Sequence, residues 1–412
     1  MVGDDGVAVT QGSMRPGPLD GIRVLELATV IMAPYASQLL GDLGAEIIKV
    51  EYGSLDSSRV MGGGPHRELS GIALNLHRNK RSISVDLKTP AGLAVFHRLL
   101  QYTDVLITNL RPGPLERLGI AFAQIADEYP TLVYCQSQGF ASDRPDADEP
   151  AYDDIIQALT GMPALNEDVL GKKAFFPSLI ADKIAGMTIA YGILAALVHR
   201  ERTGEGQRVE IPMFDAVLSF NLVEHLSRAA VHGEPATYSR IMTPHRGPHK
   251  TADGYVAMMP YTDHHWTTLF AAVGREDVLE RPWFRSHRSR LLQADKVYSD
   301  LAEIIAGRTT GEWLELCSVH GIPASATPSM SEIVEDPALH RNVLVDAEHP
   351  VVGTYRVIRP PVIFSESPAS VRLPAPLVSE HTVEILREAG YSDEEILELV
   401  EADVVSVRSA ED

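Results

Sequence analysis

Cysteine is nearly absent from this 412-residue chain, which contains only Cys135 and Cys317. Two cysteines so far apart predict neither a disulfide framework nor a zinc site with clustered ligands. His245 and His249 have the spacing of neighbours on one face of a helix, but no clear helical pattern and no third ligand accompany them. We therefore predict no metal site.

The N-terminus shows no signal peptide. Residues 1–17 are rich in Gly, Asp, Ser and Pro and have few apolar side chains, so we predict a disordered leader and a cytoplasmic location. No apolar run approaches the roughly 18 residues that a membrane span requires. The most apolar long stretch, residues 184–198, lies between Lys183 and the charged segment 199–202. This pattern predicts a buried core helix and no membrane partner.

Positive charge is scarce, because 36 Lys and Arg stand against 56 Asp and Glu and give a formal net charge of −20. A field of this sign repels nucleic acid and anionic lipid, so neither is an expected partner. An anionic ligand must therefore meet a local basic patch.

Glycine is missing from the turn that follows the first predicted strand, residues 28–34. A dinucleotide pyrophosphate approaches the backbone closely at such a turn, where the G-x-G-x-x-G fingerprint supplies the room. The glycine run at residues 62–64 follows no clear strand. The sequence thus argues against a nicotinamide or flavin cofactor.

Strand and helix patterns do alternate along the first half of the chain. Apolar strand patterns occur at residues 22–27, 46–51, 82–87, 104–109, 132–135 and 208–211. Strands separated by helices form parallel βαβ units with right-handed crossovers. We predict a doubly wound, mostly parallel (Rossmann-like) α/β sheet, whose ligands bind beyond the carboxyl ends of its strands.

The chain is long enough for two domains. Residues 231–250 carry Gly, Pro and His with little periodicity, which predicts a linker. A smaller α+β unit begins after it, at about residue 251. Near the end of the chain, Ser392 and Glu395 have the spacing of a capping box, which predicts a helix over residues 393–401.

Basic residues concentrate near the predicted strand ends. They are Arg59, Arg78, Lys80, Arg81, Lys88, Arg111 and Arg117. In so acidic a chain this concentration favours a phosphate-rich ligand, and charge balance at the surface is the alternative. Arg111 directly follows a strand, at the ligand-binding end, which strengthens the functional interpretation.

Asp182 stands at the start of the long apolar helix. An aspartate there is a good N-cap, but in a partly dry site it is also a nucleophile toward a thioester. Position alone favours the cap. Nearby, Asp153 and Asp154 precede an apolar stretch, and because adjacent helical residues do not face each other, we interpret one of them as a cap.

Several short segments follow one another in a characteristic order between about residues 18 and 400. They are residues 18–25, 41–51, 79–83, 86–88, 109–113, 181–182, 192–197, 202–207, 251–255 and 380–382. Each is unspecific alone, but the ordered set resembles the class III coenzyme A transferases, which include formyl-CoA transferase and carnitine-CoA transferase.

The resemblance implies an interlocked homodimer. In such proteins the large domain is built from both chain ends, here 18–230 and 355–412, and the small domain with its return linker from 251–354. It also implies that Asp182 is the nucleophile, through an aspartyl anhydride and an aspartyl-CoA thioester. Coenzyme A is then part of the substrate, and no metal or redox cofactor is required.

The resemblance also implies CoA contacts. By position they are Val30, Ile31, Met32, Val85, Lys88, Asn109, Leu110, Arg117 and Tyr152. Where relatives carry a basic residue after the second strand, this chain has Tyr52, so we expect Arg59 or Arg81, with Arg111, to meet phosphates. A glycine run expected near residues 242–248 is reduced to Gly247, which argues against oxalate or formate as substrates.

Two other functions stay open. α-Methylacyl-CoA racemase belongs to the same superfamily and uses a His and an Asp, but its histidine falls on Tyr152, a poor base at neutral pH. A CoA-binding protein without catalysis is the remote alternative. For the transferase, four polar residues of the small domain are candidates to hold a second carboxylate of the substrate: His245, Arg246, Tyr261 and His264.

Overall fold

The computed structural model describes residues 15–53 and 55–408, which fall into two compact units. The larger unit contains the chain up to Leu159, Ser178–Leu218 and the chain from His340 onward, and the smaller contains Thr160–Pro177 and Ser219–Leu339. The chain thus returns to the larger unit at His340. Most of the expected leader, residues 1–14, lies outside the described residues.

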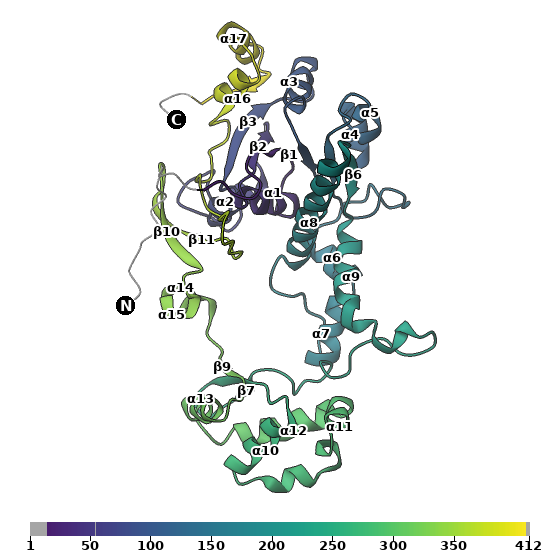
Figure 1. Ribbon diagram of the computed structural model, residues 1–412, viewed down its shortest axis with the longest axis vertical. Helices are drawn as coiled ribbons and strands as arrows, with labels where there is room; N and C mark the ends of the chain where they lie inside the picture. The colour runs from purple at the N-terminus through teal and green to yellow at the C-terminus, as the bar shows by residue number, and fades with distance from the viewer. Residues whose placement is uncertain (1–14, 54, 409–412) are drawn as a thin grey trace. The chain divides into compact units, whose positions relative to one another are not determined.

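The larger unit is built on a seven-stranded sheet with the strand order β12-β3-β2-β1-β4-β5-β6 (Figure 1). All neighbours are parallel except β12, which pairs antiparallel with β3. The strands are β1 (Arg23–Leu27), β2 (Glu46–Glu51), β3 (Lys80–Val85), β4 (Val105–Thr108), β5 (Val133–Gln136), β6 (Gln207–Glu210) and β12 (Val405–Ser406). This order confirms the doubly wound fold, and its direction reverses between β1 and β4.

Helices connect the strands and pack on both faces of this sheet (Figure 1). They are α1 (Met32–Asp42), α2 (Gly71–Leu76), α3 (Pro90–Leu100), α4 (Pro112–Leu118), α5 (Phe122–Ile125), α6 (Asp153–Leu159), α8 (Ile180–Thr203), α16 (Thr382–Glu388) and α17 (Asp393–Glu401). Helix α9 (Met213–His225) begins in this unit. The predicted capping box of Ser392 and Glu395 is present at α17.

Helix α8 is long and apolar enough to cross a membrane, with a mean hydropathy of 1.5 over its best window. In this fold, 56% of that window is buried, and the helix packs on α1 and α6 and against β5 and β6. Gly186 permits the contact with α1, because a Cβ there would lie 2.7 Å from the Met32 carbonyl oxygen. Helix α8 is therefore a core helix of the larger unit.

The C-terminal segment covers the β3 edge of the sheet. Beside the two-residue strand β12, the Tyr52 hydroxyl donates to the Asp403 carbonyl at 2.9 Å, and Arg408 pairs with Glu68 at 2.9 Å. Upstream, the hairpin of β10 (Leu344–His349) and β11 (Gly353–Ile358) leads into the proline-rich return segment. Neither β12 nor this hairpin was predicted, because β12 has only two residues and a distant partner, and the hairpin strands are largely exposed and lack a clear apolar pattern.

The smaller unit has a three-stranded antiparallel sheet in the order β7-β8-β9, as an α+β unit should. Its elements are α7 (Met162–Leu170), β7 (His249–Lys250), β8 (Tyr255–Met258), α10 (Asp263–Ala272), α11 (His287–Leu292), α12 (Ala294–Ile305), α13 (Thr310–Val319), β9 (Ala324–Ala326), α14 (Met330–Glu335) and α15 (Pro337–His340). Its core centres on Trp266, Phe270 and Trp313.

Candidate active site

A pocket of about 180 Å³ opens where the strand order reverses, beyond the carboxyl ends of β1 and β4. This is the position at which doubly wound folds bind ligands. The lining residues are Thr29, Val30, Met32, Asn109, Arg111, Gln138, Gly139, Glu149, Pro150, Ala151, Tyr152, Asp182 and Met213. The pocket thus brings together six of the residues that the sequence singled out: Val30, Met32, Asn109, Arg111, Tyr152 and Asp182.

Asp182 lies in the first turn of α8, three residues inside the helix that begins after Leu179. Leu179 is the N-cap residue and no side chain caps the helix, so the interpretation of Asp182 as an N-cap is wrong. The helix begins at Ile180, so Asp182 lies inside it and not just before it. Asp182 instead projects a carboxylate into the pocket, at the N-terminal end of the α8 dipole.

The Asp182 carboxylate is buried without a cation. The residue is 7% exposed, and no described residue donates a hydrogen bond to its oxygens or forms an ion pair with it. Burial raises the pKa of Asp182 to about 7, and the negative charge of Asp153 adds to this rise. A carboxylate with this pKa is ionised in part at neutral pH and is weakly solvated, both of which suit a nucleophile.

Asp153 is the neighbour that sequence reasoning did not place. It is the first residue of α6 and is 4% exposed, and its Oδ1 accepts a hydrogen bond from the backbone N–H of Asp182 at 3.1 Å. Its Oδ2 accepts from Gln157 at 2.6 Å. Asp153 therefore joins the start of α6 to the start of α8, while Asp154 is exposed. The adjacent pair Asp153 and Asp154 was the signal in the sequence that could have pointed to this contact.

The turn after β1 forms another wall of the pocket. The Asn109 side chain accepts from the Thr29 N–H at 3.1 Å and donates to the Thr29 carbonyl at 2.8 Å. Val30 follows with a left-handed φ of 69°, and α1 then starts at Met32 without a side-chain cap. The N-terminus of α1 thus begins at the pocket, where its backbone N–H groups are suited to an oxyanion.

Most of the predicted basic cluster has another role. Four of its members are buried and paired with carboxylates: Arg59 with Glu51, Arg78 with Asp42, Lys80 with Glu26, and Arg81 with Glu46, Glu384 and Glu388. Their donors are occupied, so Arg59 and Arg81 are not free to hold phosphates. The charge pattern of the sequence did not distinguish buried ion pairs from a phosphate site.

Three basic residues remain exposed near the pocket end of the sheet. Arg111 lines the pocket and donates to the Asp148 carbonyl at 2.5 Å. Lys88 follows β3 and Arg117 lies in α4, and within the described residues neither side chain forms a hydrogen bond or an ion pair. Of the seven predicted basic residues, these three are the ones that the described fold leaves available to an anionic ligand.

The remaining predicted CoA contacts lie around this site to different depths. Tyr152 is 65% exposed at the rim of the pocket. Ile31 is buried in the turn before α1, and Val85 is buried at the end of β3. Leu110 is half-buried after β4 and packs on the core. Ile31, Val85 and Leu110 have apolar side chains, so they define the shape of the surface around the site and offer it no side-chain hydrogen bonds.

The four predicted substrate residues are not gathered in one place. Arg246 lines a cavity of about 430 Å³ together with His249, Met258, Met259 and other residues of the smaller unit. Its Nε is buried without a hydrogen-bond partner. The lining contains no Asp or Glu. An unpaired guanidinium in an apolar cavity is suited to a carboxylate.

The other three predicted substrate residues line different surfaces. Tyr261 lines a separate, much smaller cavity with Arg240. His264 lies on α10 beside Thr268, and His245 lies 3.9 Å from the Asp295 carboxylate. Over the described part of the chain, no group of three or more His, Cys, Asp or Glu is arranged to hold a metal ion.

These features define a doubly wound α/β protein whose ligand pocket contains a buried, unpaired carboxylate. A model of CoA-transferase family III matches residues 19–382. The chain belongs to this family and is an enzyme of the CoA-transferase class, for which CoA thioesters are substrates.

Individual relatives agree with this assignment. The chain is 31% identical to the probable fatty acyl-CoA transferase Rv3272 of Mycobacterium tuberculosis, covering 90% of this chain and 97% of the relative. It is 33% identical to the succinyl-CoA–L-malate CoA-transferase β subunit of Chloroflexus aurantiacus (94% and 98% covered). It is also 33% identical to the formyl-CoA:oxalate CoA-transferase of Streptomyces avermitilis (92% and 97%).

Solved structures are similar over the same length. The crystal structure of Rv3272 has a TM-score of 0.77 and 29% identity, covering 90% of this chain and 99% of the other. A CAIB/BAIF family protein from Brucella suis has a TM-score of 0.76 and 26% identity, with 91% and 100% covered.

Proposed function

We propose that this enzyme transfers coenzyme A between carboxylic acids through a covalent intermediate on Asp182. The observation that carries the proposal is a buried carboxylate with no cationic partner, in a pocket at the switch point of a doubly wound sheet. Such a group is held ready to attack, because no ion pair must be broken first.

The proposed sequence of steps balances without a cofactor. An Asp182 carboxylate oxygen attacks the thioester carbonyl carbon of the donor, the C–S bond breaks, CoA leaves as a thiolate, and a mixed anhydride of Asp182 and the donor acid remains. The thiolate attacks the Asp182 carbonyl carbon, the donor acid leaves as a carboxylate, and an aspartyl-CoA thioester remains. The acceptor carboxylate repeats the two steps in reverse order, which forms its thioester and restores Asp182.

The surroundings supply the other requirements of these steps. Each attack places negative charge on a carbonyl oxygen, and the first N–H groups of α1, which begins at the pocket wall, are suited to bind that charge. Lys88, Arg111 and Arg117 are suited to the phosphates of CoA, since they are exposed and carry no carboxylate partner in the described chain. Arg59 and Arg81 are not part of this proposed site.

The cavity around Arg246 suggests which acids react. We infer that it binds a carboxylate of the acceptor that is remote from the reacting one, because Arg246 is unpaired and the walls are otherwise mainly apolar. An acceptor that carries a second carboxylate matches this chemistry. A dicarboxylic acid is therefore the class of acceptor that we test first.

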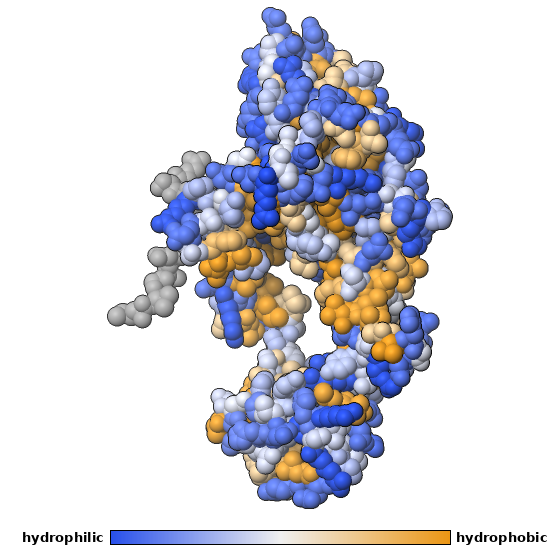
Figure 2. All heavy atoms as spheres, turned by 45° about the vertical axis from the view of Figure 1, so that its right-hand side comes forward, coloured by the Kyte–Doolittle hydropathy of each residue, from blue (hydrophilic) through white to orange (hydrophobic). Residues whose placement is uncertain are grey.

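A homodimer is part of the proposal. In the larger unit, α6 and α8 expose large apolar side chains, and Figure 2 shows hydrophobic side chains (orange) gathered on that side of the molecule. The exposed large apolar residues of α6 and α8 are Ile155, Leu159, Met187, Tyr191 and Val198. A surface this apolar is typical of an obligate interface. Light scattering should give twice the mass of one chain, and Tyr191→Glu should shift the mass toward one chain; a wild-type monomer contradicts the dimer.

Trapping experiments test the activity itself. Incubation with a donor such as succinyl-CoA and hydroxylamine should inactivate the wild type and add a hydroxamate to the peptide that contains Asp182. A racemase or a non-catalytic binding protein gives no such adduct, and a racemase exchanges the α-proton of a 2-methylacyl-CoA for deuterium. Absence of both the adduct and any new thioester, seen by mass spectrometry, would refute the transferase mechanism.

A further inference from the structure

The turn between β1 and α1 is held in a conformation that its sequence does not favour. Val30 has a φ of 69°, which places a β-branched residue in the left-handed region. Such a conformation persists only where the surroundings hold it. Because Thr29 and Val30 line the Asp182 pocket, the shape of this turn is also the shape of one pocket wall.

Side chains bind every backbone polar group from the Ala28 carbonyl to the Val30 N–H. The Asn109 side chain forms hydrogen bonds with both backbone polar groups of Thr29, its N–H and its carbonyl. On the other side, Lys49 donates to the Ala28 carbonyl at 2.7 Å, and Asp56 accepts from the Val30 N–H at 2.9 Å. Two separate clamps therefore fix the turn, one at the surface and one in the interior.

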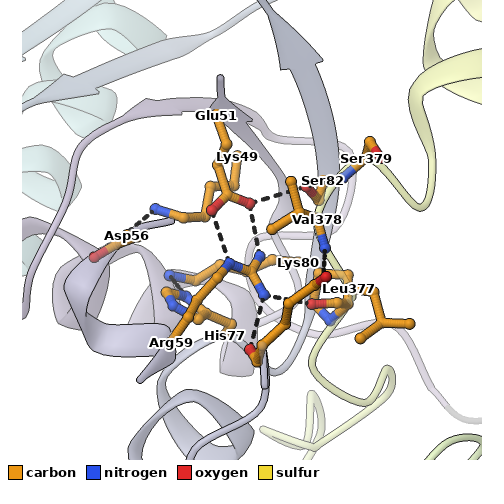
Figure 3. Close-up of polar contacts among 12 residues, drawn as sticks. Lys49, Glu51, Asp56, Arg59, His77, Lys80, Ser82, Leu377, Val378 and Ser379 are labelled. Atoms are coloured by element: carbon orange, nitrogen blue, oxygen red, sulfur yellow. Dashed lines mark hydrogen bonds and ion pairs between the residues drawn. The ribbon is translucent and has the colours of Figure 1, made fainter. Parts of the chain in front are cut away.

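The interior clamp is a chain of buried charges. Lys49 donates its three hydrogens to Glu26 at 2.8 Å, to Ala28 and to Asp56 at 3.0 Å. Figure 3 shows Lys49 pointing toward Asp56. The Oδ1 of Asp56 also accepts from the Ser58 N–H at 3.0 Å, at the start of a short 3-10 helix.

The same cluster of buried charges also contacts the first turn of α1, at the other end of the β1–α1 turn. Glu26 accepts from Lys80 at 2.8 Å, and Lys80 donates to the Pro34 carbonyl in α1 at 2.8 Å. Lys49, Lys80 and Glu26 are fully buried. Apolar side chains of similar volume stabilise a core at least as well as buried ion pairs. The charges instead supply directed contacts to Ala28, Val30 and Pro34, which apolar side chains cannot supply.

We propose that Lys49 and Asp56 are positioning residues, which hold the strained turn Ala28–Val30 in the shape that binds the thioester end of acyl-CoA beside Asp182. The inference rests on the proposed CoA-transferase function and deepens it. Neither residue lines the pocket, so both act through the backbone of the turn.

Asp56→Ala tests this role, because it removes the acceptor of the Val30 N–H. The KM for acyl-CoA should rise, and kcat/KM should fall by between about tenfold and a hundredfold. Asp56→Asn keeps an oxygen for the Val30 N–H and should recover most of the loss. A merely structural role would not produce this rescue together with a change in KM.

Asp42→Ala is the matched control for stability. Asp42 is also a buried carboxylate of the larger unit, paired with Arg78 at 2.6 Å, but it lies at the opposite end of α1. Both alanine variants should lower the Tm, and only Asp56→Ala should change the KM. A wild-type KM and kcat in Asp56→Ala, or equal kinetic losses in both variants, would overturn the inference.

The design separates this inference from the proposed function. Transfer by the wild type tests the function, whereas the ratio of variant to wild type tests the positioning role. If the wild type transfers no CoA, calorimetric binding of succinyl-CoA replaces KM. Weaker binding to Asp56→Ala than to Asp42→Ala then still supports the role of the turn, and equal binding overturns it.

Discussion

Two buried carboxylates of the larger unit differ in their partners and therefore in their chemistry. Glu26 lies beneath the first turn and pairs with Lys49 and Lys80. Although burial alone raises its pKa, the two lysines lower the pKa of Glu26 to about 2. Asp182 has no cation, and burial raises its pKa to about 7. Burial by itself thus does not mark a site, whereas burial without a partner does.

The same rule applies to cations. Arg59 and Arg81 are buried against carboxylates and stabilise the fold, while Arg246 lines a cavity without any carboxylate. Paired charges in this molecule belong to its scaffold, and unpaired charges point to ligands. The following substitutions test this division, in order of the expected effect.

Asp182→Asn should abolish CoA transfer. The amide is not a nucleophile, so kcat should fall by at least about a thousandfold. Asp42→Asn, which alters a paired buried carboxylate away from the pocket, should keep its turnover per folded molecule. Steady-state rates with protein checked by circular dichroism provide the measurement, and residual turnover in Asp182→Asn near the wild-type rate contradicts the nucleophilic role.

Glu26→Gln should destabilise the fold by about 3 to 5 kcal/mol at pH 7, because it leaves two buried lysines without their carboxylate. The pKa of Glu26 is lowered in the folded state, so its stabilisation is present above about pH 4.5 and is lost as the pH falls toward 2. Urea unfolding at pH 7 and pH 3 should show the larger difference from the wild type at pH 7. An equal difference at both values would show that the lysines do not depend on this charge.

Asp182→Asn should have the opposite effect on stability. The pKa of Asp182 is raised, so the folded state binds a proton that the unfolded state has lost between about pH 4 and pH 7, and wild-type stability falls across that window. At pH 8 the variant should be more stable, by at most about 4 kcal/mol. At pH 4 the two proteins should unfold alike, and a variant that is less stable at pH 8 would contradict the buried, unpaired state.

Arg246→Gln should raise the KM for a dicarboxylic acceptor by about tenfold, since one charge-assisted carboxylate contact is lost. The KM for a monocarboxylic acceptor and for the donor should change little. Arg308→Gln is the control, because Arg308 stacks on Trp313 in the same unit without lining the cavity. Equal effects on both classes of acceptor would remove Arg246 from the proposed binding site.

Asp153→Asn should produce the smallest change. It removes the neighbouring charge that adds to the raised pKa of Asp182, and its amide oxygen still accepts from the Asp182 N–H. The acidic limb of the kcat/KM profile should therefore move to lower pH by less than about one unit. A shift to higher pH would mean that Asp153 stabilises the ionised form of Asp182.

The sequence predicted those features that depend on local patterns. The apolar strands β1 and β2 and the capped helix α17 lie where periodicity placed them. The ordered motifs also led to the family, and through it to Asp182. These signals are short-range or are carried by several segments at once.

Long-range pairing was not predictable from single residues. Arg59 and Lys80 carry the positive charge of phosphate ligands and lie near strand ends in the sequence. In the fold, however, their partners Glu51 and Glu26 neutralise them. Of the adjacent pair Asp153 and Asp154, one was interpreted as a helix cap and neither was linked to Asp182. The contact of Asp153 with Asp182, 29 residues away, exists only after α6 and α8 pack. A charge acquires its role from its partner, and the partner is set by topology.

The closing strand β12 has a consequence for biosynthesis. Arg59 donates to the Pro376 carbonyl across 317 residues of sequence, and Arg408 pairs with Glu68 across 340. The ribosome therefore completes the smaller unit, Ser219–Leu339, before the segments that finish the first sheet emerge. Until Val405–Ser406 leave the exit tunnel, the β3 edge stays open to other chains, and a product truncated before β12 would keep that edge exposed.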